Sequence, residues 1–119
     1  MARALVVDDS KFMRRIIVET LVGGGHEIIA EADNGADGIE SYISYKPDFV
    51  TMDITMGGKD GIRAVHEIKT HDSSAKIIVI SALNEMTIKG NDSTIQADAF
   101  LTKPFEKEDL LKTVEKLLS

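Results

Sequence analysis

Residues 49–58 read FVTMDITMGG: a run of mostly apolar residues leads directly into Asp53, and two glycines follow a few positions later. The run at 49–52, preceded by the turn-forming pair Pro47-Asp48, is typical of a short buried strand flanked by loops. Asp53 therefore lies at the carboxyl end of a predicted strand. Ligands and chemistry gather at that end in open parallel sheets, so Asp53 is the first candidate functional residue.

Strand-like and helix-like segments alternate along the chain. Strands are predicted at residues 4–7, 28–32, 49–52, 77–80 and 99–101. Several of these segments are apolar throughout, as strands covered on both faces must be. Most of the segments after them have the apolar spacing of helices, most clearly in the stripe from Leu110 to Leu118. Repeated β-α units predict an α/β fold with a doubly wound parallel sheet.

Local signals indicate where the helices begin and end. The first helix is predicted to begin around Ser10 and to end at the glycines 23–25, which lack the Gly-Lys-Ser/Thr ending of a phosphate loop. Asp60 is predicted to be the N-cap of the helix that contains Ile62 and Val65. Residues 84–95 are rich in weak helix formers, so a helix predicted there depends on packing against the rest of the domain.

Composition excludes several classes of protein. A length of 119 residues with 43% hydrophobic content suits one domain over residues 1–119. The absence of cysteine excludes disulfides and cysteine-based metal sites. No apolar run approaches the ~20 residues that a membrane helix needs, so we expect a cytoplasmic protein without membrane insertion. A net charge of −6 disfavours nucleic-acid binding.

A second predicted strand also ends in acidic residues, which lie near Asp53 if the two strands are neighbours. The first predicted strand runs directly into Asp8 and Asp9. If the first and third strands are neighbours in the sheet, these two carboxylates and that of Asp53 face one crevice. Like charges so close together oppose ionisation unless a cation offsets them, and Mg²⁺ tolerates a site with few carboxylates and several waters. The sequence therefore predicts a Mg²⁺ site formed by Asp8, Asp9 and Asp53.

Two further strand ends bring a hydroxyl and an ammonium group to the same edge. Ser81 follows the fourth predicted strand and Lys103 follows the fifth. Acids, hydroxyl, ammonium and metal together suit phosphoryl transfer, in which a carboxylate attacks phosphorus and forms an aspartyl phosphate. In this interpretation Asp53 is the nucleophile, Lys103 stabilises the developing oxyanion charge and Ser81 donates a hydrogen bond.

These residues resemble those of the receiver domains of two-component response regulators, especially the stand-alone chemotaxis type. The pair Asp8-Asp9, Asp53 with the following ITM, Ser81-Ala82 and Lys103-Pro104-Phe105 occur in the family's order and at its strand ends, and the resemblance covers essentially the whole chain. It implies a flavodoxin-like, five-stranded parallel sheet in the order 2-1-3-4-5 with five flanking helices, a topology of which chemotaxis receivers are a standard example.

The resemblance also implies a role for each residue of the site. Asp53 would accept a phosphoryl group from a histidine kinase, in a phosphoacceptor signalling protein that catalyses its own phosphorylation and dephosphorylation. Asp9, Asp53 and the backbone carbonyl of Thr55 would bind Mg²⁺ directly, whereas Asp8 would act mainly through water. Lys103 would bind the phosphoryl group.

The same resemblance implies how phosphorylation is read. Ser81 and Phe100 match the family's paired switch positions, which remodel the surface that a partner recognises. The expected partner is a flagellar switch or another motility or adaptor protein, bound by a monomer. The Lys103–Pro104 peptide is expected to be cis. Gly57 departs from the family, since relatives usually carry proline at that position.

The residues leave three alternative functions open. Within the family, the chain could be an intermediate phosphoryl carrier in a multistep phosphorelay. An aspartate-nucleophile phosphatase of the haloacid-dehalogenase kind needs a second aspartate two residues after the nucleophile, where Thr55 stands. A flavodoxin-like binder of nucleotide or flavin needs free amides and few acids after the first strand, and Asp8-Asp9 argues against it.

Overall fold

The computed structural model describes residues 1–54, 60–82 and 96–119. The strands in these ranges are β1 (Arg3–Val7), β2 (Glu27–Ala32), β3 (Phe49–Asp53), β4 (Ile77–Ser81) and β5 (Ala99–Thr102). The helices in these ranges are α1 (Lys11–Gly23), α2 (Gly35–Tyr45), α3 (Asp60–His71) and α5 (Lys107–Leu118). The five predicted strands are confirmed, each slightly longer than predicted. The helix predicted at 84–95 lies outside the described residues.

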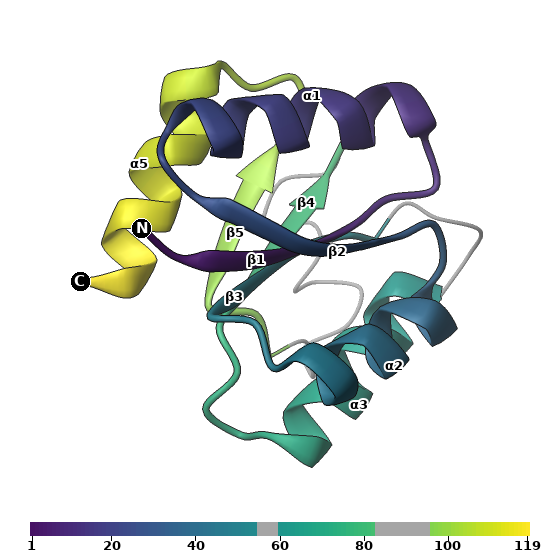
Figure 1. The fold of residues 1–119 in the computed structure, drawn as a ribbon. Coiled ribbons are helices and arrows are strands. Elements are labelled where there is room, and N and C mark those ends of the chain that lie inside the picture. Colours follow the sequence, from purple (N-terminus) through teal and green to yellow (C-terminus); the bar gives the residue numbers. More distant parts are fainter. Residues whose placement is uncertain (55–59, 83–95) are drawn as a thin grey trace.

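The strands form one parallel sheet in the order β2-β1-β3-β4-β5. Helices α1 and α5 cover one face of this sheet, and α2 and α3 cover the other (Figure 1). Both the doubly wound α/β fold and the strand order expected from the sequence are therefore confirmed. Because β1 and β3 are neighbours, the residues that follow their carboxyl ends are brought together.

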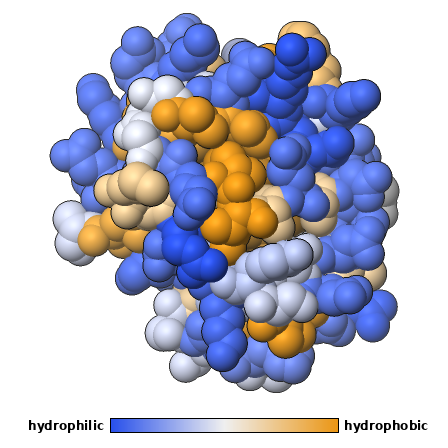
Figure 2. Space-filling model, in the orientation of Figure 1, coloured by the Kyte–Doolittle hydropathy of each residue, from blue (hydrophilic) through white to orange (hydrophobic). Residues whose placement is uncertain are grey.

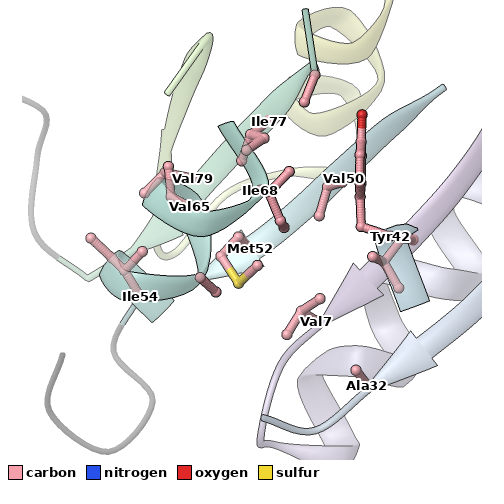
Figure 3. Close-up of a cluster of buried hydrophobic side chains, with 13 residues drawn as sticks. Val7, Ala32, Tyr42, Val50, Met52, Ile54, Val65, Ile68, Ile77 and Val79 are labelled. Carbon is pink, nitrogen blue, oxygen red and sulfur yellow. The ribbon is translucent and has the colours of Figure 1, made fainter. Parts of the chain in front are cut away.

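The sheet separates two hydrophobic cores. Leu5 and Val7 of β1 point into the core beneath α2 and α3, whereas Ala4 and Val6 point into the core beneath α1 and α5. This alternation is the period-two pattern of a strand that is buried on both faces. Figure 3 shows the first core, in which Val7 and Met52 lie near one another. These two residues immediately precede Asp8 and Asp53, so the core fixes the strand ends that carry the two acids.

The helix ends follow the predicted signals, with one exception. Ser10 caps α1, since its Oγ accepts a hydrogen bond from the Met13 amide at 3.2 Å, and the helix ends at the predicted glycines. The prediction that Asp60 is the N-cap of its own helix is wrong, because Asp60 is itself in the first turn of α3. Its carboxylate instead accepts a hydrogen bond from the Gly35 amide at 2.6 Å and so satisfies a free N–H at the start of α2.

The burial of the strands differs between the middle and the edge of the sheet. Strands β3 and β4 are buried throughout, whereas the middle residues of the edge strand β2 are only partly buried. Figure 2 shows a mostly hydrophilic face on which the largest apolar patch lies over α1 and β2, with smaller apolar areas elsewhere on the same face. No helix in the described part of the chain is long and apolar enough to cross a membrane.

Candidate functional site

Three carboxylates meet at the carboxyl ends of β1 and β3. Val7 pairs with Met52 across these strands, so the residues that follow each of them are neighbours. One carboxylate oxygen from each of Asp8, Asp9 and Asp53 lies within 4.8 Å of the other two. Asp8 and Asp53 are buried, whereas Asp9 is exposed. The predicted convergence of these three residues, here called the acidic cluster, is therefore observed.

Asp8 is held by backbone hydrogen bonds on two sides. Its amide donates to the Ala32 carbonyl of β2 at 3.0 Å, and its Oδ1 accepts from the Ser10 amide at 2.8 Å. Its other oxygen, Oδ2, is buried and has no hydrogen-bond partner among the described residues. Burial raises the pKa of Asp8 to about 6, and the nearby Asp53 carboxylate adds to this rise, against the lowering effects of Ser10 and Lys103.

The ammonium group of Lys103 lies beside the acidic cluster. Its Nζ donates to Asp53 Oδ2 at 3.0 Å and lies 4.0 Å from Asp8 Oδ2. The position of Lys103 is set from β4, because its backbone amide donates to the Ser81 carbonyl at 2.7 Å. The Lys103–Pro104 peptide is cis, as expected. The structure therefore brings Lys103 to Asp53, as predicted from their strand-end positions.

The remaining predicted residues lie around this group. Ser81 is buried as the last residue of β4, next to Thr102 of β5. Phe100 is half-buried on β5 and packs against the core beneath α2 and α3. Thr55, whose carbonyl is the predicted third direct metal ligand, and Gly57 lie outside the described residues.

The sequence did not predict the roles of two residues near the site, Gly61 and Arg14. A Cβ atom on Gly61 would lie 2.5 Å from the Asp53 carbonyl oxygen, so only glycine allows the start of α3 to approach β3 this closely. The guanidinium of Arg14 donates from Nη1 to the Asp8 carbonyl oxygen at 2.7 Å. No sequence signal separates Arg14 from the adjacent Arg15, and Gly61 reads as an ordinary helix residue after Asp60.

The donor set of the acidic cluster fits a hard divalent cation. Carboxylate oxygens are the preferred ligands of Mg²⁺, and three such groups within 4.8 Å of one another repel unless a positive charge offsets them. The buried Oδ2 of Asp8, which has no hydrogen-bond partner among the described residues, adds an acceptor for a metal-bound water. The ammonium group of Lys103 offsets this repulsion only in part, because its Nζ is 3.0 Å from Asp53 Oδ2 but 4.0 Å from Asp8 Oδ2.

The arrangement suits nucleophilic attack by a carboxylate. Asp53 is an ionisable oxygen nucleophile at a strand end, and the adjacent Lys103 ammonium can stabilise negative charge that develops on an incoming electrophile. The excess of carboxylates favours an electrophile that brings or recruits a cation, as a phosphoryl group with Mg²⁺ does.

Comparison with known proteins gives concordant results. The sequence model of the response regulator receiver domain family matches residues 4–115. The chemotaxis protein CheY of Bacillus subtilis is 44% identical over 117 residues, which cover 98% of each of the two chains. CheY of Thermotoga maritima is 39% identical over 97% of this chain and 96% of that protein. Among solved structures, the CheX-CheY-BeF3-Mg+2 complex from Borrelia burgdorferi superposes with a TM-score of 0.90 at 30% identity, covering 98% of this chain and 89% of the matched chain.

Proposed function

This chain belongs to the response regulator receiver domain family, as a chemotaxis-type phosphoacceptor signalling protein rather than a classical enzyme, and we propose that Asp53 is the residue that accepts the phosphoryl group from a histidine kinase. The observation that carries this proposal is the placement of Asp53 among three clustered carboxylates and 3.0 Å from Lys103 Nζ. Exposed acids often cluster without chemical consequence, but a buried carboxylate in contact with a partly buried ammonium is a strong candidate for chemistry.

Each residue of the site has its own role in phosphoryl transfer. A carboxylate oxygen of Asp53 forms a bond to phosphorus as the bond from phosphorus to the donor's imidazole nitrogen breaks, which leaves an acyl phosphate on Asp53. Lys103 binds an oxygen of the transferred group, and the Ser81 hydroxyl donates a hydrogen bond to it. Mg²⁺, held by Asp9, Asp53 and the Thr55 carbonyl with Asp8 acting through water, would neutralise charge on the phosphoryl oxygens.

The output of the protein is a change in the surface that a partner binds. Ser81 and Phe100 are the proposed switch pair: the hydroxyl moves toward the phosphoryl group and the aromatic ring turns inward from β5. The partner is a motility switch or adaptor protein. The Borrelia burgdorferi relative supports two parts of the proposal: it was solved with BeF3 and Mg+2, in keeping with a metal and phosphoryl site, and with CheX, in keeping with recognition by another protein. We further propose that residues 1–119 form one receiver domain that acts as a cytoplasmic monomer.

Phosphorylation by a small donor tests the assignment of Asp53. The protein is incubated with acetyl phosphate and MgCl₂, and its intact mass is measured. We expect one added phosphoryl group that EDTA prevents and hydroxylamine removes, as for an acyl phosphate. Asp53→Asn should abolish the addition. Asp33→Asn is the matched control, because Asp33 is an exposed aspartate that follows β2 at the same edge of the sheet. Phosphate that survives Asp53→Asn would overturn the assignment.

A second measurement tests the switch. Amide NMR spectra before and after phosphorylation should show changes that extend from Asp53 to Ser81 and Phe100. Changes confined to the acidic cluster and Lys103 would instead indicate a passive phosphoryl carrier, the alternative within the family.

A further inference from the structure

We propose that Arg14 is a positioning residue for the metal site, and that it acts by fixing the peptide group between Asp8 and Asp9. This inference rests on the proposed function, because it assigns Arg14 a role in binding the divalent ion that the acidic cluster would hold. Arg14 is not itself a ligand, since its side chain carries only donors and a positive charge.

Arg14 links three elements of the fold. It is the fourth residue of α1, and its side chain is only 18% exposed. Nη1 donates to the carbonyl oxygen of Asp8 at 2.7 Å, and Nε donates to Glu31 Oε1 on β2 at 3.2 Å. The guanidinium group presents its donors in a rigid plane, so two contacts in different directions determine its orientation. Glu31 anchors the guanidinium, and the guanidinium in turn anchors the backbone of Asp8.

The hydrogen bond from Arg14 to the Asp8 carbonyl affects the positions of both Asp8 and Asp9. A peptide group is planar, so a fixed carbonyl oxygen on Asp8 also fixes the direction of the Asp9 amide and limits where the Asp9 side chain can lie. Asp8 is further held through its own amide by Ala32 and through Oδ1 by Ser10. Arg14 supplies the remaining backbone constraint, because it holds the carbonyl side of Asp8. Without it, the exposed Asp9 would sample more orientations and hold a cation less well.

Charge and geometry predict opposite effects when Arg14 is removed. A nearby positive charge disfavours a bound cation, so if Arg14 acted only through its charge, Arg14→Ala would tighten Mg²⁺ binding. If Arg14 positions the Asp8-Asp9 peptide, the same substitution weakens binding. Partners that orient metal ligands typically change metal affinity by about 10- to 100-fold when removed. Weaker Mg²⁺ binding by Arg14→Ala would therefore show that the positioning effect exceeds the effect of charge.

The adjacent Arg15 provides a matched control. It is on the same helix and carries the same charge, but its side chain is 79% exposed and is paired with Glu19 at 3.1 Å on the helix surface. Arg15→Ala thus removes one positive charge from the next position of α1 and leaves the hydrogen bond from Arg14 to the Asp8 carbonyl in place. The difference in Mg²⁺ affinity between Arg14→Ala and Arg15→Ala isolates the contribution of positioning.

The test is the Mg²⁺ dissociation constant, measured with MgCl₂ by isothermal titration calorimetry for the wild type and the variants. We expect Arg14→Ala to weaken binding about tenfold or more and Arg15→Ala to leave it equal or slightly tighter. Arg14→Lys keeps the charge but cannot make both contacts, so it should also weaken binding. Glu31→Gln keeps an acceptor for Nε and should lose less affinity than Arg14→Ala.

The outcomes separate the failure of this inference from that of the proposed function. Wild-type protein that takes up no Mg²⁺ would overturn the proposed function and this inference with it. Wild-type protein that binds Mg²⁺, together with Arg14 variants that bind it as tightly as Arg15→Ala does, would overturn the positioning role alone. Urea unfolding of each variant identifies any that fails to fold. If Arg14→Ala fails to fold, the Mg²⁺ affinities of Arg14→Lys and Glu31→Gln are compared with that of Arg15→Ala in its place.

Discussion

Replacing Asp8 with asparagine should stabilise the metal-free protein at neutral pH. Asp8 is fully buried, and burial raises its pKa from 3.8 to about 6. At neutral pH the folded protein therefore holds an ionised carboxylate that it binds less favourably than the protonated form. Asparagine has nearly the same shape, can keep the hydrogen bond from the Ser10 amide and carries no charge. Its amide can also donate toward Asp53.

The size of the effect follows from the shift in pKa. A rise from 3.8 to about 6 corresponds to about 3 kcal/mol between the two protonation states. Because the folded-state pKa lies above the unfolded value, the stability contributed by Asp8 is fully present below pH 3.8 and is lost as the pH rises through about 6. Asp8→Asn should thus be more stable than the wild type by up to about 3 kcal/mol near pH 7.5, and this advantage should shrink by about half near pH 5.

Urea unfolding in EDTA, followed by circular dichroism, measures this difference at both pH values. Comparing the variant with the wild type at each pH cancels the other groups that titrate in this range. Added Mg²⁺ should stabilise the wild type and reverse the order of the two proteins, because the ion binds the folded form of the wild type more tightly. An Asp8→Asn protein less stable than the wild type near pH 7.5 in EDTA, or an advantage independent of pH, would refute the reasoning.

Three other changes have defined outcomes. Gly61→Ala should destabilise the fold by roughly 1–3 kcal/mol in urea unfolding and shift the Asp53 amide resonance, because the new Cβ would meet the Asp53 carbonyl oxygen. His26→Gln should reduce the loss of stability below about pH 6.5, measured as the urea midpoint at two pH values. Burial and the N-terminal amino group lower the pKa of His26, whose Nδ1 accepts from the Ala2 amide, so its stabilisation is present above the ordinary pKa and lost in acid. Lys103→Met should lower stability at neutral pH by roughly 1–3 kcal/mol and slow phosphorylation by acetyl phosphate, because it removes the ammonium from Asp53. An unchanged urea midpoint for Gly61→Ala would contradict the first prediction, and a loss of stability in acid equal to that of the wild type for His26→Gln would contradict the second. Phosphorylation of Lys103→Met at the wild-type rate would contradict the third.

The fold and the acidic cluster could be predicted because their signals are local. Each central strand is an apolar run with a polar residue at its end, and parallel strands bring all such ends to one edge of the sheet. Once β1 and β3 are neighbours, Asp8 and Asp53 have to meet. The convergence of Lys103 on Asp53 follows from the same rule applied to β5.

The supporting contacts could not be predicted, because they depend on the relative placement of elements distant in sequence. Asp60 looks like a cap for its own helix, but the packing of α2 against α3 brings it to the Gly35 amide instead. Gly61 is required only because α3 approaches the backbone of Asp53 so closely. Arg14 differs from Arg15 only in the face of α1 on which it lies, and the contact with Asp8 and Glu31 becomes visible only in the folded structure.

Titration of isotopically labelled protein with MgCl₂, followed by amide NMR, tests the central claim most directly. We predict saturable one-to-one binding with the largest shifts at Asp8, Asp9 and Asp53, and loss of this binding when Asp9 and Asp53 are both replaced with asparagine. Shifts that fail to saturate, or that are largest away from the ends of β1 and β3, would show that these carboxylates do not form a metal site and would contradict the account.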